Sequence, residues 1–119
     1  MLLALLRMDL DDWRRQIDAI DAELVRLLNR RAACAAEIGR LKRERDLDVY
    51  SPEREAEVLR HVQAVNGGPL QPEAIARLFE RIIDEARRVE RLAHQDETSP
   101  GRKDAAVADA VSTDRQSGE

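Results

Sequence analysis

The 119-residue sequence has few of the side chains that build disulfides, metal centres or aromatic clusters. Its one cysteine, Cys34, excludes an intrachain disulfide and any site that needs several cysteines. The two histidines, His61 and His94, lie 33 residues apart without the close spacing typical of metal ligands, so we expect no metal. Only three residues are aromatic. A core in this chain must therefore be mainly aliphatic.

Long hydrophobic runs and an excess of positive charge are also missing. The longest apolar run covers residues 1–6, which is far shorter than the roughly 18 residues of a membrane span. The first ten residues carry no small-residue cleavage site of a signal peptide. Lys and Arg number 20 against 24 Asp and Glu, a net charge of −4, which gives no reason to expect nucleic acid as a partner. We therefore expect a cytoplasmic protein that binds neither membranes nor nucleic acid.

Apolar residues are concentrated in the first 95 positions. Residues 96–119 contain no Leu, Ile or aromatic residue and hold six acidic against three basic residues. Such a segment cannot bury enough apolar surface to offset the entropy of ordering, so we predict a disordered tail over 96–119. Residues 9–95 are predicted to form one domain. Residues 1–8 form an N-terminal extension whose order the sequence leaves open.

A long heptad pattern dominates this domain. After Asp9, a typical helix-capping residue, apolar residues recur at alternating spacings of three and four. We call these residues the seam: Leu10, Trp13, Ile17, Ile20, Leu24, Leu27, Cys34, Ile38 and Leu41. The pattern predicts a helix from about residue 10 to about residue 44, on the order of 50 Å long. A compact chain of this size is only roughly 26 Å across. The seam therefore needs a partner, and we predict a homodimer.

Two shorter helices follow. Ser51 and Pro52 are a typical helix start, and residues 66–69 (NGGP) end that helix. Pro72 opens a third helix, whose apolar stripe ends near His94. No strand pattern is present. We predict an all-α chain of a long, a short and a medium helix.

Charged residues interrupt the apolar face of the long helix. The heptad requires an apolar residue at position 31, where the chain has Arg31. Lys42 follows eleven residues later, within about 20° of three whole turns, so the two cations share a face. Gly39 lies between them and costs about 1 kcal/mol in a helix interior. We expect Gly39 to allow the close approach of another backbone or of a ligand.

The other two helices carry charges at matching places. Glu90 lies on the apolar stripe of the third helix, and Arg54 and Glu55 lie one turn before the apolar stripe of the second. Buried lone charges cost several kcal/mol each unless they are paired. Two interpretations remain open from the pattern alone. The charges form a salt-bridge network among packed helices, or they form a pocket whose arginines bind an anionic ligand.

Five stretches together resemble the all-helical, type II chorismate mutases of the AroQ class. They are WRRQIDAIDAELVRLLNRR (13–31), AAEIGRLK (35–42), VYSPEREAEVL (49–59), NGGPL (66–70) and IARLFERIIDEARRVE (75–90). The resemblance covers roughly residues 9–95 and implies an intertwined helical homodimer with two active sites. It also implies the reaction, a unimolecular Claisen rearrangement of chorismate to prephenate on the route to phenylalanine and tyrosine. No cofactor and no covalent intermediate are expected.

The resemblance also implies residue roles. Arg31 and Arg14 of the partner subunit would bind the two substrate carboxylates, with support from Arg54. Lys42 would donate a hydrogen bond to the ether oxygen as the carbon–oxygen bond breaks. Negative charge grows on that oxygen, so such a donor stabilises the transition state more than the ground state.

Three further roles concern the other side of the substrate. Glu90 would lie beside the ether oxygen, and Glu55 would bind the ring hydroxyl together with the backbone of Ser51. Many members of the family have an acid where this chain has Ser51, and some have glutamine where it has Glu90. Only a protonated Glu90 can donate to the ether oxygen.

Two other functions fit the same pattern. One is an isochorismate–pyruvate lyase on the same scaffold, which would use a nearly identical substrate and a similar cationic pocket. The other is a non-catalytic helical dimerisation module, whose mark would be the loss of a key cation. A synthase of the shikimate pathway is a further possible partner, for which the tail or the 66–70 loop would offer a contact.

Overall fold

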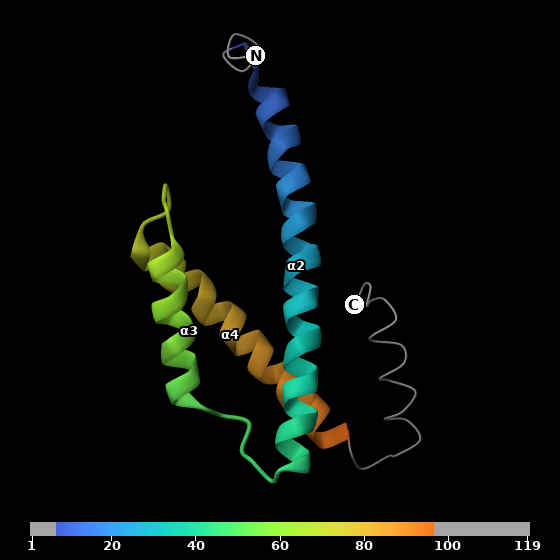
Figure 1. Cartoon of the computed structure of the whole chain (residues 1–119). Helices are drawn as coiled ribbons and strands as arrows, with labels where there is room; N and C mark the ends of the chain where they lie inside the picture. The colour runs from blue at the N-terminus through green and yellow to red at the C-terminus, as the bar shows by residue number, and fades with distance from the viewer. Residues whose placement is uncertain (1–6, 97–119) are drawn as a thin grey trace.

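The computed structural model describes residues 7–96, and all regular structure there is helical. Helix α2 spans Leu10–Glu44, α3 spans Pro52–Val65 and α4 spans Pro72–Gln95 (Figure 1). The predicted all-α chain of a long, a short and a medium helix is confirmed. Residues 1–6 of the predicted N-terminal extension lie outside the described residues, and so does the predicted tail except for Asp96.

Helix α2 begins at a reciprocal capping box. The backbone N–H of Asp12 donates to the Asp9 carboxylate at 2.9 Å, and the Asp9 N–H donates to the Asp12 carboxylate at 3.1 Å. The hydrogen bond from the Asp9 backbone is the main reason why the pKa of Asp12 lies below its ordinary 3.8. Because the folded state binds this proton more weakly than the unfolded state, the contribution of Asp12 to stability is present above about pH 4 and is lost as the pH falls further.

The two shorter helices start as their local sequences predict. The Ser51 hydroxyl accepts a hydrogen bond from the Arg54 N–H at 3.4 Å, and Pro52 occupies the first turn of α3. Pro72 does the same in α4, where its fixed φ suits the first helical turn. Between these helices the Asn66 side chain accepts from the Gly68 N–H and donates to the Leu70 carbonyl, which closes the turn.

The core of the chain lies where α4 crosses the C-terminal half of α2. Among the described residues, the buried apolar side chains are Ala35 of α2 and Ile83 and Ala93 of α4. Helix α3 packs against α4, and the N-terminal half of α2 extends beyond both (Figure 1). The molecule is therefore elongated, with principal extents of 59, 31 and 17 Å.

The seam of α2 is not covered by its own chain. Eight of its nine residues have exposed fractions between 43% and 64%, and Cys34 is also exposed. Burying one such side chain is worth about 1.5–3 kcal/mol. An apolar stripe of this length is typical of a surface that another chain covers.

Gly39 marks the closest approach of α2 to α4. It is buried, and a Cβ built on it would lie 2.9 Å from the Cα of Glu90 and closer still to the Glu90 carbonyl oxygen. These are backbone atoms, which cannot move aside as the end of a side chain can. The expectation that Gly39 admits another backbone is confirmed, and this crossing brings Glu90 close to Lys42, which lies one turn after Gly39 on α2.

Replacing Gly39 with alanine should therefore destabilise the fold. We expect Gly39→Ala to lower the free energy of unfolding by about 1–3 kcal/mol, because overpacking at the crossing outweighs the gain of about 1 kcal/mol in helix propensity. Urea denaturation followed by circular dichroism measures this change. Gly67→Ala is the control, because a Cβ there meets no atom within 4 Å. Equal stability of the two variants would contradict the tight crossing.

Candidate active site

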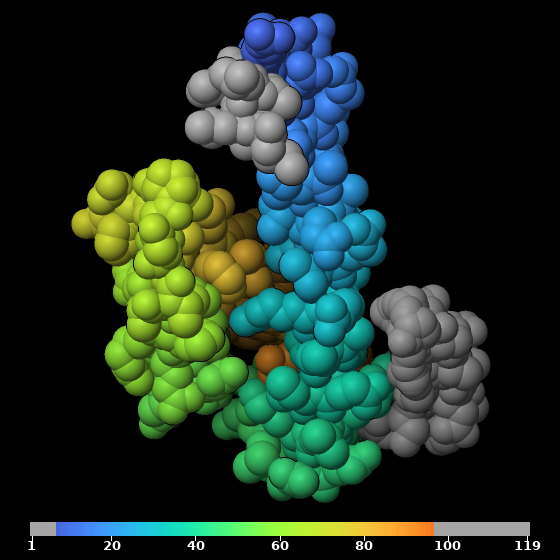
Figure 2. All heavy atoms as spheres, turned by 45° about the horizontal axis from the view of Figure 1, so that its top comes forward, coloured from blue at the N-terminus to red at the C-terminus, as the bar shows by residue number. Residues whose placement is uncertain are grey.

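A cavity of about 450 Å³ opens between the three helices. In Figure 2, α4 is visible between α2 and α3, at the back of the hollow that separates them. The volume falls in the usual range for small-molecule sites, about 300–1,000 Å³. Apolar side chains of all three helices line part of the wall. The polar and charged lining residues are Arg31, Lys42, Ser51, Arg54, Glu55, Arg87 and Glu90.

Six of the seven residues that the sequence predicts for the site line this cavity. They come from the C-terminal half of α2, the start of α3 and the second half of α4. Arg14 is the exception, because it lies near the exposed start of α2, where it pairs with Asp11 at 3.7 Å. Cys34 and Ile38, which the heptad pattern counts with the seam, line the cavity instead.

Lys42 and Glu90 form an ion pair across the cavity wall. The Lys42 Nζ donates to Glu90 Oε1 at 3.0 Å and to the carbonyl oxygen of Val49 at 2.6 Å. The two side chains are 20% and 16% exposed, so water screens the pair less than it screens a surface salt bridge. The ammonium carries three N–H donors, and these two bonds leave one for a ligand.

Glu55 is paired with Arg87, which the sequence analysis did not select. The Arg87 Nη2 donates to both Glu55 oxygens, at 2.9 and 2.7 Å, and its Nε donates to Oε2 at 3.0 Å. These hydrogen bonds are the main reason why the pKa of Arg87 is raised above its ordinary value. Arg87 lies four residues after Ile83 and three before Glu90, so it lies on the same apolar stripe of α4 as Glu90.

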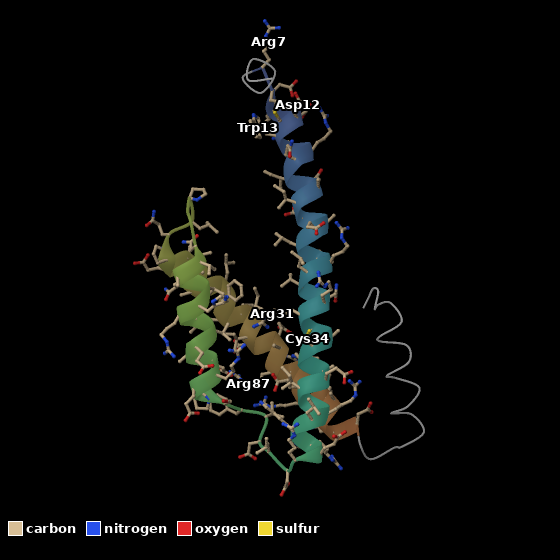
Figure 3. All side chains as sticks on the ribbon, viewed as in Figure 1. Arg7, Asp12, Trp13, Arg31, Cys34 and Arg87 are labelled. Carbon is tan, nitrogen blue, oxygen red and sulfur yellow. The ribbon has the colours of Figure 1, made fainter. Side chains whose placement is uncertain are left out.

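The remaining two cations are available to a ligand. Within residues 7–96, the half-buried Arg31 has neither a hydrogen-bond nor an ion-pair partner. Arg54 is 71% exposed and reaches only Glu57, at 3.3 Å. Figure 3 shows Arg31 of α2 and Arg87 of α4 in the region between the helices. Both earlier interpretations therefore apply in part: Lys42 and Glu90 form a salt bridge, while Arg31 and Arg54 are left for an anion.

The structure gives two further results on candidate sites. Among residues 7–96, no group of three or more His, Cys, Asp or Glu side chains is placed to hold a metal ion. In the same part of the chain, no helix combines the length and hydropathy that crossing a membrane requires.

Comparison with known proteins agrees with this arrangement. The sequence matches the family described as chorismate mutase type II over residues 13–91, which includes every predicted site residue. It is 53% identical over 78 residues to a bifunctional chorismate mutase/prephenate dehydratase of Neisseria gonorrhoeae, covering 66% of this chain and 21% of that protein. It is 38% identical over 79 residues to the protein of the same name from Aquifex aeolicus, covering 63% and 22%. The chain thus spans about a fifth of the length of these curated relatives.

A solved structure shares the fold. It is a chorismate mutase (form II) from Thermus thermophilus, with a TM-score of 0.66 and 38% sequence identity. The match covers 67% of this chain and 91% of that one. The three helices are therefore an arrangement already seen in another protein, and the cavity lies within the matched family region.

Proposed function

This chain belongs to the type II chorismate mutase family, and on that basis we propose that its cavity converts chorismate into prephenate. The reaction is an intramolecular rearrangement in which an ether carbon–oxygen bond breaks while a carbon–carbon bond forms, without loss or gain of atoms. The substrate carries two carboxylates. The observation that supports this function most strongly is that the unpaired Arg31 and the Lys42–Glu90 pair line the same cavity.

The charges of the cavity suit such a substrate. Lys42 and Arg87 offset Glu90 and Glu55, which leaves Arg31 to face one substrate carboxylate and Arg54 to support the binding of the second. Arginine binds a carboxylate through two parallel hydrogen bonds, which fixes orientation as well as position. Two such contacts would hold the substrate in the folded shape that the rearrangement requires.

Lys42 is the residue that we assign to the bond-breaking step. Its free N–H would point at the ether oxygen, on which negative charge grows in the transition state. The bonds to Val49 and Glu90 already fix the ammonium in place, so little reorganisation is needed during the reaction. No proton has to be transferred. Glu90, as the other member of the pair, would contact the same oxygen.

Glu55 and the start of α3 would bind the ring hydroxyl. The Glu55 carboxylate would accept a hydrogen bond from the hydroxyl, together with the backbone at Ser51. The Ser51 side chain already accepts from the Arg54 N–H, so its hydroxyl serves chiefly as the helix cap. This is the physical consequence of having serine where many members of the family have an acid.

The second subunit is part of this proposal. The seam of α2 is exposed along its whole length, and Arg14 lies on the uncovered half of that helix. An intertwined homodimer would cover the seam and carry Arg14 of the partner subunit to the mouth of the cavity. There it would bind the second carboxylate, with Arg54 in support. The dimer would contain two such sites.

One assay separates the competing functions. The purified chain is incubated with chorismate and, in parallel, with isochorismate. We expect chorismate to disappear with formation of an equal amount of prephenate, without added metal or cofactor. Release of pyruvate and salicylate from isochorismate alone would identify a lyase instead. No turnover of either substrate by the folded dimer would favour a non-catalytic dimerisation module.

The role of Glu90 predicts that a hydrogen-bond donor at this position supports turnover. Glu90→Gln places an N–H donor beside the ether oxygen, whereas Glu90→Ala places none. We therefore expect kcat/KM for chorismate to be higher for Glu90→Gln than for Glu90→Ala. Glu85→Gln, an exposed position outside the cavity, should keep the wild-type value. Equal kcat/KM for Glu90→Gln and Glu90→Ala would contradict the role of Glu90.

A further inference from the structure

Arg87 makes several hydrogen bonds to Glu55 in addition to the attraction between their charges. Three hydrogen bonds of 2.7–3.0 Å join its Nε and Nη2 to both carboxylate oxygens. Its third nitrogen, Nη1, lies 3.5 Å from Asp84 one turn earlier on α4. The Nε and Nη2 donors are therefore committed to Glu55, and Nη1 lies near Asp84.

The surroundings of this pair restrict its motion. The Arg87 and Glu55 side chains are 24% and 26% exposed. The Arg87 guanidinium also lies over the ring of Tyr50, 5.2 Å from its centroid, in a cation–π arrangement. Within the described part of the chain, this is the one ion pair that joins α3 to α4. It links the start of α3, where the site residues Ser51 and Arg54 lie, to the helix that carries Glu90.

The Glu55 carboxylate keeps capacity for another donor. A carboxylate offers about four lone-pair positions on its two oxygens. The three Arg87 bonds account for three of them, which leaves one for another donor, and Glu55 lines the cavity. A hydrogen-bond acceptor held in one orientation discriminates strongly against a ligand that lacks the matching donor.

We propose that Arg87 is a positioning residue for recognition of the ring hydroxyl, a role that it exerts by fixing the Glu55 carboxylate in the orientation that accepts the hydroxyl hydrogen. This assignment rests on the proposed function of the cavity. Arg87 does not contact the substrate. Its influence reaches the substrate only through Glu55 and therefore only through the ring hydroxyl.

The test compares two substrates. One is chorismate, and the other is the analogue in which hydrogen replaces the ring hydroxyl. For Arg87→Leu we expect kcat/KM on chorismate to fall by roughly 10- to 100-fold, the loss typical of a misplaced substrate contact. On the analogue we expect a change of less than about twofold. Arg87→Lys keeps the positive charge but loses the planar set of N–H donors. Its kcat/KM on chorismate should therefore fall less than that of Arg87→Leu.

Two controls separate positioning from structure. Arg88→Leu changes the neighbouring arginine, which is 73% exposed and pairs only with Glu85. It should leave kcat/KM unchanged on both substrates. In a Glu55→Ala background, Arg87→Leu should cause no further loss, because both substitutions remove the same interaction. Circular dichroism and sedimentation show whether each variant keeps the fold and the dimer. If Arg87→Leu does not fold, the comparison is made with Arg87→Lys.

Three outcomes would overturn the assignment. They are unchanged turnover of chorismate by Arg87→Leu, an equal loss on both substrates, and an additional loss in the Glu55→Ala background. Each would occur with a wild type that still converts chorismate, so each contradicts the role of Arg87 alone. Failure of the wild type to convert chorismate would contradict the proposed function and, with it, this assignment.

Discussion

Replacing Lys42 with alanine is expected to lower kcat/KM for chorismate by roughly 100- to 1,000-fold, the usual cost of removing one donor aimed at a developing negative charge. Lys42 is largely buried and already fixed by two hydrogen bonds, so its free N–H is oriented before the reaction begins. The effect should fall mainly on kcat, because the donor interacts more strongly with the transition state than with the ground state. Steady-state kinetics over a range of chorismate concentrations separate the two parameters.

Two further variants complete the Lys42 experiment. Arg45→Ala removes a neighbouring exposed cation that does not line the cavity, and it should keep wild-type kinetics. Arg31→Ala removes the unpaired arginine and should raise KM as well as lower kcat, since a carboxylate contact acts in the ground state and in the transition state. Wild-type turnover by both Lys42→Ala and Arg31→Ala would show that the chemistry lies outside this cavity.

A charge placed in the middle of the seam is expected to separate the proposed homodimer and abolish activity. Ile20 is 55% exposed on α2, in the half of the helix that α3 and α4 leave uncovered. Ile20→Glu would bury an unpaired carboxylate in each subunit of a symmetric interface, at a cost of several kcal/mol for each. Loss of the partner removes its Arg14 from the cavity. Sedimentation and the chorismate assay on the same sample measure both effects.

The matched control for the seam is Arg26→Glu. It introduces the same side chain on the opposite face of α2, where Arg26 pairs with Glu23 on the surface. We expect it to remain dimeric and active. Progressive dilution of the wild type provides a test that does not depend on a variant, because activity per subunit should fall as the dimer dissociates. A fully active monomer in either experiment would contradict the dimer and the role of Arg14.

The helix boundaries could be predicted because they depend on local chemistry. Asp9, Ser51, Pro52 and Pro72 each determine a helix start through their own backbone preference or cap, without help from distant residues. Gly39 was informative for a related reason, because a glycine within a helix is costly and indicates a close contact. The sequence could not tell which backbone approaches it. The structure shows the backbone of Glu90.

The heptad pattern could not show which seam residues would line the cavity. An α-helix has 3.6 residues per turn, so a seven-residue repeat drifts by about 20° per heptad along a straight helix. From Trp13 to Cys34 the repeat spans three heptads, and the stripe therefore turns by about 60°. Trp13 is uncovered because the start of α2 extends beyond α3 and α4, whereas the drift helps to bring Cys34 and Ile38 to the cavity.

The pairing inside the cavity also needed the structure. The sequence pattern predicted that Lys42, Glu55 and Glu90 lie close to the interior between the helices. It could not predict which oppositely charged side chain each of them would pair with. Arg87 lies on the same apolar stripe as Glu90, yet α4 carries four further arginines, all exposed, which differ from it in their position around or along the helix: Arg77, Arg81, Arg88 and Arg91. Which arginine reaches Glu55 depends on how α3 packs against α4, a tertiary property.

Each proposed active site contains residues of two chains, and an experiment that mixes two inactive variants tests this arrangement. Arg14→Ala and Arg31→Ala homodimers should each have little activity on chorismate. When equal amounts are unfolded and refolded together, half of the dimers are mixed, and each mixed dimer contains one site with both arginines intact. We expect recovery of about one quarter of wild-type activity per subunit, the value set by two-fold symmetry. No recovery above that of the separate variants, with mixed dimers shown to be present, would contradict it.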